Sequence, residues 1–431
     1  MSSNGFICAK LDEVALVVMG QSPKGEDCNL NGIGIPLLNG PTEFGTSYPT
    51  PVQYTTDPKK RAKKGDLLFC VRGSTVGRMN WADREYAIGR GLASISPKYI
   101  GEEHYIKALV DYNLPHILNI ATGSTFPNVS KDTLIQLDVL IAPREERINI
   151  SKLFKSIDNK IELNNAINKN LEELAQALFK RWFVDFEFPN ENGEPYKSSG
   201  GEFEESELGL IPKGWKVDLL PDWIDFLEGP GIRNWQYKEE GIKFLNIRCI
   251  KNQDLDLMTA NKVSEEEANG KYKHFLLAEG DVVVSTSGTL GRSAIVRKEH
   301  LPLMLNTSII RFRPKDGMSF SFMHQYLLSK EFVNELNTKA SGSVQLNFGP
   351  KHLKTIKMLI PEKQLLGKFE YAVRPLIDQM CSLKTENNRL LILRDSLLPK
   401  LMSGEIRVPV EQELSTHESY LVAENRAAYQ P

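Results

Sequence analysis

The residues best suited to chemistry in this chain are small polar side chains on two glycine-rich loops, Arg72–Arg78 and Thr286–Arg292. Hydroxyl and amide groups on such loops can hydrogen-bond base edges and phosphates, and arginine adds a sequence-independent attraction to a phosphate backbone. Any single Ser, Thr or Lys in a turn is better explained as a solvated side chain. The occurrence of two such loops in one chain nevertheless favours binding to nucleic acid.

The candidate DNA contacts come from these loops, from a basic run before the first loop and from a later polar stretch in each half. In the first half they are Lys59, Lys60, Arg61, Lys63, Lys64, Arg72, Ser74, Thr75, Arg78, Arg90, Ser124, Thr125 and Asn128. In the second half they are Thr286, Ser287, Thr289, Arg292, Ser343, Gln345 and Asn347. The basic run has no obvious counterpart in the second half, and a flexible surface loop is an equal interpretation of it.

The sequence contains no motif for a reaction. A phosphate-binding GxxxxGK[ST] loop is missing, and Ile88–Gly91 supplies only a GxG fragment of a dinucleotide fingerprint. There is no HExxH, no Cys/His ligand spacing and no Asn/Asp-Pro-Pro-aromatic string of the kind used by amino-methyltransferases. The five cysteines are scattered, which is typical of a reducing cytoplasm. We therefore expect a non-catalytic cytoplasmic protein without a metal site.

Composition places the chain among ordinary globular proteins. Hydrophobic residues make up 41% and charged residues 25%. No apolar run approaches the roughly 20 residues of a membrane span, and the N-terminus lacks a signal-peptide pattern. The net charge of −2 counts mildly against a nucleic-acid binder, so any DNA contact must depend on local basic patches.

The second half of the chain repeats the first. Gly65–Leu68 matches Gly280–Val283, the Gly-Arg pair at residue 78 matches the one at residue 292, and the stretch 123–134 matches 342–353. The matched glycines follow or precede apolar strands that must hold the loops. The polar residues on the loops differ between the copies, whereas a shared reaction would need the same groups twice. Duplication predicts pseudo-twofold symmetry and two binding units with different targets.

Each half ends in a long helix with a seam of alternating four- and three-residue steps, which is the pattern of a coiled coil. The first seam begins at Ile150 and the second at Phe369, and asparagines in both favour one defined register. The seam residues that define the pairing are Ile157, Ile161, Asn164, Asn168, Leu171, Leu178, Met380, Leu383, Asn387, Leu390 and Leu397. Pro375 predicts a bend in the second helix or a later start. The best seam passes through Leu376, although matching the two halves by identity favours Ile377.

These patterns predict an α/β (α+β) fold in which two pseudo-twofold-related globular domains are joined by two long helices that form an antiparallel coiled coil. The domains are residues 1–142 and 215–360, and the helices are 143–188 and 361–408. Residues 189–214 have the Gly- and Pro-rich composition of a linker. The tail, 409–431, is expected to be poorly ordered.

Three stretches resemble the specificity subunit of type I restriction-modification enzymes: Leu174–Phe186, Gly193–Trp215 and Leu397–Ile406. The similarity covers about residues 10 to 408. It implies two target-recognition domains that each read one half of a split, asymmetric site in double-stranded DNA. It also implies that the helices set the spacing and dock two methyltransferase subunits, and that restriction-translocase subunits join. S-adenosylmethionine, ATP and Mg would then belong to those partners, with no cofactor in this chain and no membrane partner.

Two other hypotheses remain open at this stage. The chain could be a DNA-acting enzyme with an unrecognised active site, or a coiled-coil scaffold for proteins only. Salt-sensitive DNA binding separates the scaffold from the DNA-recognition hypothesis, since phosphate contacts release counterions.

Overall fold

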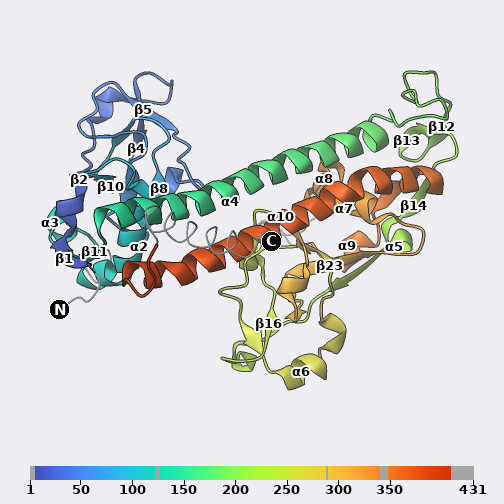
Figure 1. Cartoon of the computed structure of the whole chain (residues 1–431). Coiled ribbons are helices and arrows are strands. Elements are labelled where there is room, and N and C mark those ends of the chain that lie inside the picture. Colours follow the sequence, from blue (N-terminus) through green and yellow to red (C-terminus); the bar gives the residue numbers. More distant parts are fainter. Residues whose placement is uncertain (1–4, 122–126, 288–289, 340–347, 409–431) are drawn as a thin grey trace, which may run out of the picture. The chain divides into compact units, whose positions relative to one another are not determined.

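The computed structural model describes residues 5–121, 127–287, 290–339 and 348–408 (Figure 1). The chain forms two compact units: the first consists of Met1–Leu163 and Asn388–Pro431, and the second of Asn164–Asn387. The two boundaries fall inside the long helices α4 (Arg144–Phe179) and α10 (Lys363–Met402). Each unit therefore contains one part of each long helix.

The first unit is organised around an antiparallel four-stranded sheet of order β2-β10-β7-β8 (Figure 1). Its strands are β2 (Ala15–Met19), β7 (Leu67–Cys70), β8 (Met79–Trp81) and β10 (Leu92–Pro97). Every residue of β7 is buried, as the apolar run predicted. The sheet shares a hydrophobic core with α2 (Glu103–Ile120), α3 (Lys131–Ile135) and the paired strands β1 (Ile7–Lys10) and β11 (Asp138–Ile141).

A second sheet of the first unit has the order β3-β5-β4-β9-β6. Its strands are β3 (Cys28–Asn29), β4 (Ile35–Leu38), β5 (Gln53–Thr55), β6 (Arg61–Ala62) and β9 (Tyr86–Ile88). Strands β4 and β9 run parallel, and the other neighbours are antiparallel. A separate core beneath this sheet includes Leu38, Phe44 and Tyr86.

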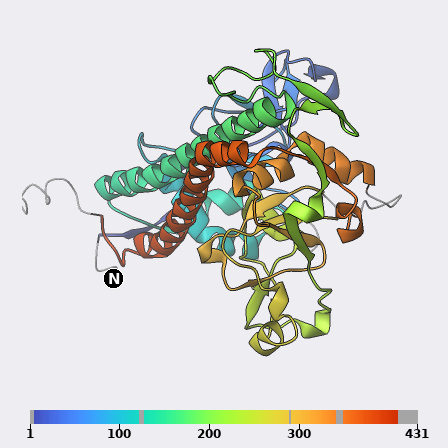
Figure 2. The ribbon, with the colours of Figure 1, turned by 90° about the vertical axis from the view of Figure 1, so that its right-hand side faces the viewer.

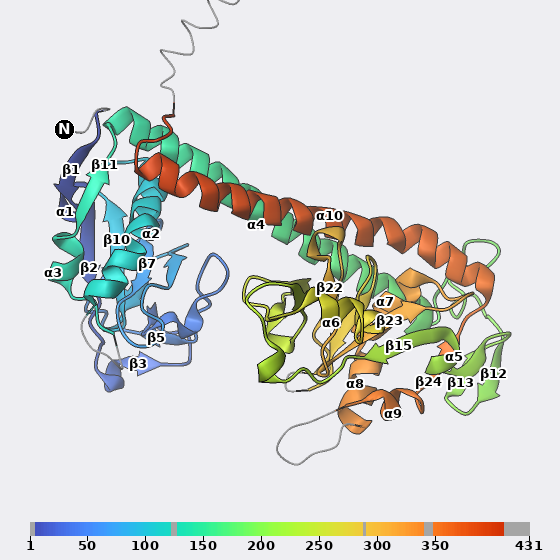
Figure 3. The same ribbon diagram turned by 90° about the horizontal axis from the view of Figure 1, so that it is seen from below.

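The second unit repeats this plan (Figure 3). Its four-stranded sheet has the order β15-β23-β20-β21, formed by Ile224–Glu228, Ile309–Pro314, Val282–Ser285 and Ser293–Ile295. Its three-stranded sheet, β19-β16-β22, again contains one parallel pair, β16 (Ile242–Phe244) with β22 (Leu303–Met304), beside β19 (Lys262–Val263). Two helices, α7 (Phe320–Leu328) and α8 (Lys330–Lys339), take the place of α2.

The turn that precedes the central strand, β7 in the first unit and β20 in the second, has the same hydrogen bond in both units. Asp66 and Asp281 are both buried, and their carboxylates accept a hydrogen bond from the backbone N–H three residues earlier, at 2.8 and 2.7 Å. The glycines before them, Gly65 and Gly280, have φ of 89° and 85°, which only glycine adopts readily. The predicted duplication is thus present in the fold, down to one hydrogen-bonded turn.

Within each unit the two long helices pack against each other in opposite directions (Figure 1). In the first unit Glu146 pairs with Arg407 at 2.6 Å, whereas Asp158, later in α4, faces Arg394, earlier in the chain, at 3.6 Å. In the second unit Asn164 meets Asn387, and Phe179 lies 6.2 Å from Phe369 between ring centroids. Later residues of α4 therefore meet earlier residues of α10, which confirms the predicted antiparallel pairing.

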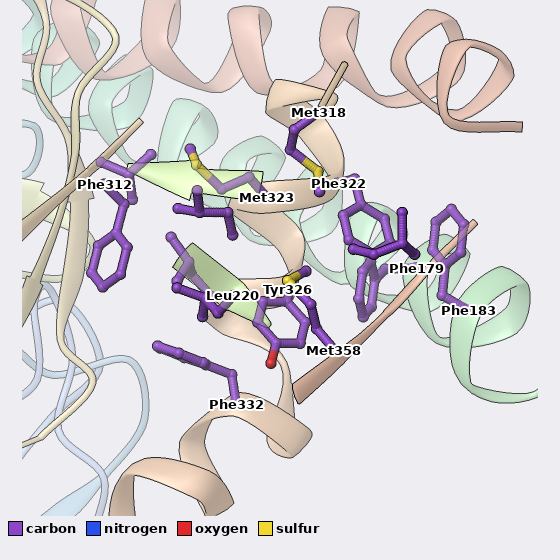
Figure 4. Close-up of a cluster of buried hydrophobic side chains, with 14 of the residues drawn as sticks. Phe179, Phe183, Leu220, Phe312, Met318, Phe322, Met323, Tyr326, Phe332 and Met358 are labelled. Atoms are coloured by element: carbon purple, nitrogen blue, oxygen red, sulfur yellow. The ribbon is translucent and has the colours of Figure 1, made fainter. Parts of the chain in front are cut away.

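An aromatic core fixes the second unit to the helices. Phe183 packs edge-to-face on Phe322 of α7 at 4.8 Å and on Phe369 of α10 at 4.8 Å (Figure 4). Glu370 of α10 also accepts hydrogen bonds from the hydroxyl of Ser319 and the N–H of Ser321, at 2.5 and 2.8 Å. These contacts hold α7 beside the first turns of α10, as Figure 2 also shows.

At this turn the seam of α10 passes through Ile377 and not through Leu376, the residue of the best heptad. Ile377 is 1% exposed, whereas Leu376 is only partly buried. The expectation of a later start is wrong, because α10 begins at Lys363 and continues through Pro375. Pro375 removes the hydrogen bond to the carbonyl of Tyr371. The Tyr371 residue is 87% exposed, so water can satisfy that carbonyl.

Part of the segment with linker composition is folded. After a π-helical turn, Lys180–Val184, the chain forms a hairpin of β12 (Phe203–Ser206) and β13 (Gly209–Pro212) near the end of α4 (Figure 1). Aromatic stacking holds it, with Phe188 4.5 Å from Tyr196 and 5.4 Å from Trp215. Strand β14 (Lys216–Leu219) pairs with β24 (Lys357–Ile360) in the second unit, as β1 pairs with β11 in the first.

None of the helices in the described ranges combines the length and the apolar character needed to cross a membrane.

Candidate nucleic-acid interface

In the first unit four loops meet at one end of the central sheet. The N–H of Gly20, after β2, donates to the carbonyl of Leu92 at 2.8 Å. The N–H of Val71, after β7, donates to Gly91 O at 2.9 Å, and Val71 O accepts from Val129 N at 2.9 Å. A Cβ on Gly20 would lie 2.1 Å from the carbonyl oxygen of Gly89, so only glycine permits this close approach.

This convergence brings several predicted contacts together. The Arg72 Nε donates to Asn128 Oδ1 at 3.1 Å, and the N–H of Arg90 donates to the hydroxyl of Ser22 at 3.3 Å. The side chains of Arg72, Ser74, Arg78 and Arg90 are exposed, and Thr75 is half-buried. We call Arg72, Ser74, Thr75, Arg78, Arg90 and Asn128 the first loop cluster. It presents cations, hydroxyls and an amide on one surface, as binding to DNA requires.

The predicted basic run is divided by the fold. Lys63 and Lys64 occupy the turn that enters β7, whereas the first loop cluster follows the strand's other end. Lys60 lies nearer to this cluster, because its carbonyl accepts a hydrogen bond of 3.0 Å from the N–H of Ile88, two residues before Arg90. Arg61 pairs with Glu85 at 3.1 Å, and Lys59 pairs with Asp57, so part of the charge of the run is neutralised.

The second unit builds the corresponding loop cluster from different residues. The N–H of Thr286 donates to Ser308 O at 3.0 Å, and Thr286 O accepts from Phe348 N at 2.9 Å, as Val71 does in the first unit. Arg292 is exposed, and its N–H donates to Ser285 Oγ at 3.0 Å. Ser287 is half-buried. Thr286 is 2% exposed, and its hydroxyl has no partner among the described atoms.

Six predicted contacts lie outside the described residues: Ser124, Thr125, Thr289, Ser343, Gln345 and Asn347.

The sequence interpretation missed an exposed tryptophan in the same region. Trp235 is 73% exposed on a short turn of the loop that follows β15. The next residue, Gln236, is buried and anchors this turn: its amide donates to Glu267 Oε1 at 3.0 Å and to the Tyr272 hydroxyl at 3.1 Å. The Gln236 Oε1 accepts from the N–H of Arg233 at 3.1 Å. An indole held out by a rigid turn beside an arginine suits an apolar contact in a DNA groove, such as the one that apolar side chains make with the methyl group of thymine.

The loop of Trp235 belongs to the same end of the sheet as Thr286. The N–H of Gly229, which follows β15, donates to Ile309 O at 3.4 Å, at the start of β23. A Cβ on Gly229 would lie 2.4 Å from the backbone of Asn306. The second loop cluster is therefore Thr286, Ser287 and Arg292 together with Trp235. The equivalent turn of the first unit carries Gly25–Asp27, which is acidic.

The described residues contain no group of three or more His, Cys, Asp or Glu side chains arranged to hold a metal ion.

Comparison with known proteins defines the class. The family model described as the type I restriction modification DNA specificity domain matches residues 7–173 and 212–365, once in each half. The chain therefore belongs to this family, and the family resemblance is confirmed.

Full-length relatives agree with this assignment. The chain is 26% identical over 408 residues to the specificity subunit of the type I restriction enzyme HindI of Haemophilus influenzae, covering 81% of this chain and 88% of the relative. It is also 26% identical over 357 residues to the specificity subunit of MjaIX of Methanocaldococcus jannaschii, covering 80% and 78%. The fold is also similar to the crystal structure of a type I restriction-modification S subunit from M. genitalium. The match covers 93% of this chain and 97% of that chain, with a TM-score of 0.56 and 16% identity. The last comparison supports the fold.

Proposed function

We propose that this chain is the DNA-recognition subunit of a type I restriction-modification complex, and that each unit reads one half of a split, asymmetric target. The observation that carries the proposal is the contrast between scaffold and loops. Both units share the strand order and the buried Gly-Asp turn, yet they present different side chains at the opposite end of the central strand. Two scaffolds with unlike loops suit two different base sequences.

The two loop clusters differ in chemistry. The first presents three arginines with hydroxyls and an amide, and the second presents one arginine, the hydroxyl of Ser287 and an indole, while Thr286 is buried. Arginine and amide groups read base edges through paired hydrogen bonds, whereas an apolar side chain contacts the methyl group of thymine in the major groove. The basic run at Lys59–Lys64 is proposed as a second surface for phosphate attraction on the first unit.

We further propose that the helix pair sets the distance between the half-sites and docks two methyltransferase subunits. The repeat supplies equivalent docking positions. Ser151 of α4 and Glu370 of α10 are equivalent, because each accepts a hydrogen bond from the N-terminus of the preceding domain helix, at His104 of α2 and Ser321 of α7. Counted from them, Leu174 of α4 is equivalent to Leu393 of α10. These leucines are 48% and 45% exposed.

Equivalent apolar side chains on both helices suit two copies of one partner. Methylation with S-adenosylmethionine and ATP-driven cleavage would belong to the methyltransferase and restriction subunits. The role of this chain is then to bind and orient DNA, without a catalytic group of its own.

The decisive experiment is an exchange of domains. Residues 1–142 are replaced by the corresponding domain of a relative with a known target, and methylated adenines are mapped in a genome that carries the hybrid chain and its methyltransferase. Half of the target should change while the other half and the spacing remain. A change in both halves, or a target of one continuous block, would contradict the proposal.

Docking is tested by placing a charge at the equivalent leucines. Leu174→Asp and Leu393→Asp should each remove one methyltransferase copy from the purified complex, and the double variant should remove both, as measured by native mass spectrometry. Leu163→Asp is the matched control, because Leu163 is 55% exposed on α4 but its equivalent on α10 is Ser382. Full occupancy in the double variant would contradict this docking surface.

A further inference from the structure

In the second unit a hairpin reaches from the domain to both long helices. The hairpin consists of β17 (Ile250–Lys251) and β18 (Asp254–Leu255), joined by Asn252 and Gln253. Both turn residues are left-handed, with φ of 50° and 56°. Such a conformation is unfavourable for residues other than glycine and persists where surrounding contacts hold it.

Gln253 contacts one helix with its side chain and the other with its backbone. Its amide donates to the carboxylate of Glu172 on α4, and its carbonyl oxygen accepts from the Nζ of Lys384 on α10 at 2.6 Å. Lys384 is partly buried, and burial lowers its pKa. A charged group in such a place needs a strong acceptor, and the turn carbonyl supplies one. The left-handed turn is therefore tied to the helix pair at two points.

A network of ion pairs supports this turn. Arg297, which is 5% exposed, donates to both carboxylate oxygens of Asp254 at 2.5 and 3.2 Å and to Glu299 at 2.6 Å. Glu299 also accepts from the hydroxyl of Thr385, the neighbour of Lys384 on α10, at 2.7 Å. Paired and largely buried charges of this kind hold a fixed geometry.

The corresponding turn of the first unit is held more weakly. There the chain between Phe44 and Pro49 turns after β4, and the hydroxyl of Tyr48 donates to Glu162 of α4 at 3.4 Å. That is a long hydrogen bond. The two units thus use the same element to touch the helices, but the second adds a buried network.

The contact at Gln253 lies where it can restrain the outer part of the domain. The central sheet of the second unit already packs on the helices through the aromatic core around Phe322. By contrast, β16 and α6 (Glu265–Asn269) lie at the end of the unit away from α10 (Figure 1). The hairpin leaves the β16 side of the domain and returns to the helices, so it acts as a brace against rotation of this outer part.

We propose that Gln253 and Lys384 form a brace that fixes the angle of the second recognition domain on the helix pair, and that this brace determines which spacing between half-sites is accepted. The inference rests on the proposed bipartite recognition. Gln253 and Lys384 are positioning residues in this proposal, since the contacts that carry it join the hairpin to the long helices. Releasing the brace lets the outer part of the domain rotate together with the turn of Trp235, which Gln236 anchors on Glu267 and Tyr272. This part of the second loop cluster can then meet a half-site displaced by one base pair.

The test uses the assembled complex with its methyltransferase and a series of duplexes whose spacer is one or two base pairs shorter or longer than the natural one. Gln253→Gly removes the amide and suits the positive φ, so it leaves the turn foldable. Lys384→Met removes the ammonium group but keeps the aliphatic chain. Lys251→Met is the matched control, because it deletes an exposed ion pair with Asp256, 2.7 Å, on the same hairpin.

Wild type and Lys251→Met should methylate one spacer length. Both brace variants should raise the relative rate on the neighbouring spacers about tenfold, which equals about 1.4 kcal/mol of lost discrimination, while the preferred bases in each half-site stay the same. A spacer profile identical to wild type in both variants overturns the inference. Loss of base preference in the second half-site also overturns it, because the residues would then act in recognition itself.

A failure of the proposed function looks different. In that case the wild-type complex would show no dependence on spacer length at all, since the target would not be split. If either variant fails to fold, Glu172→Gln serves as a milder substitution that weakens the same contact, and the same spacer profile decides the outcome.

Discussion

The side-chain amide of Asn164 donates a hydrogen bond of 2.9 Å to the side-chain oxygen of Asn387 and so joins α4 to α10 in the middle of their seam. Asn387 in turn donates to Asn165 Oδ1 at 2.9 Å, and Asn164 also reaches Glu386 Oε2 at 2.8 Å. Asn164 is fully buried and Asn387 nearly so. A buried amide is tolerated when it is paired, so this contact favours the one register in which the two asparagines meet.

Replacing one member of this pair should cost more than replacing both. Asn387→Leu leaves the amide of Asn164 with fewer partners in an apolar seam and should lower the free energy of unfolding by about 1–3 kcal/mol. The double variant Asn164→Leu/Asn387→Leu should recover most of that loss, because it removes both polar groups. Denaturant unfolding of the four chains in a double-mutant cycle measures the coupling. Strictly additive losses would contradict a specific pair.

The loop clusters should carry the DNA contacts more than the basic run does. Arg78→Ala should weaken binding about tenfold at low salt and reduce the slope of log affinity against log salt by about one, as expected for one lost phosphate contact. Lys64→Ala, at the other end of β7, is the matched control and should have the smaller effect. Fluorescence anisotropy of labelled duplex measures both. The reverse order would place the DNA on the opposite end of the sheet.

Trp235 should contribute through its ring. Trp235→Ala should cost about 1–3 kcal/mol of DNA affinity, because the burial of a large apolar side chain against the duplex is lost, and Trp235→Phe should restore part of it. Met258→Ala provides the comparison, since Met258 is 88% exposed in the same unit. Titrating the complex with duplexes that vary in the second half-site locates the contact. Equal affinity of the Ala variant and wild type would exclude Trp235 from the interface.

Acid should weaken the network behind the brace through His300. Burial, together with the charge of Arg297, lowers the pKa of His300 to about 4 from its ordinary 6.5, and its Nδ1 accepts from the N–H of Arg297 at 3.0 Å. Below pH 6.5 His300 therefore binds a proton in the unfolded chain, whereas in the folded chain its ring stays neutral until the pH falls to about 4. Stability from the neutral ring is present above pH 6.5 and is lost as the pH falls towards 4.

The measurement is the pH dependence of unfolding in wild type and His300→Gln, which keeps an acceptor without a titrating group. The difference in unfolding free energy between the two chains should shrink by about 2 kcal/mol between pH 7.5 and pH 5, at about 1.4 kcal/mol for each pH unit below 6.5. A difference that stays constant over this range would show that His300 does not titrate with folding.

The paired helices were predictable because a seam is a local pattern. Heptad spacing depends on the geometry of one helix and needs no knowledge of the rest of the fold. Heptad spacing could not decide whether Leu376 or Ile377 lies in the seam. That depends on the aromatic core that α7 and Phe183 form against α10. The hairpin at Phe203–Pro212 was hidden for a similar reason, because Phe203 of its first strand packs edge-to-face on Tyr196, which lies outside the hairpin.

The binding surface was predictable only where it coincided with the repeat. The glycine loops around Arg78 and Arg292 stood out because two copies could be compared. Lys59–Lys64 stood out by charge alone, and the fold places Lys63 and Lys64 at the other end of the strand. Trp235 gave no signal, since nothing in a sequence distinguishes an exposed indole from a buried one. The contact between Gln253 and Lys384 joins residues far apart in the chain, which no local pattern can reveal.

The turns at Asp66 and Asp281 have a consequence for how such proteins diversify. The Gly-Asp turn at the entry of each central strand is the same in both units, whereas the loops at its exit carry different side chains. Under the proposed function, a substitution of an exposed side chain at the exit would change the half-site that is read and would leave the entry turn intact, so one half of the target could be altered while the domain keeps its fold.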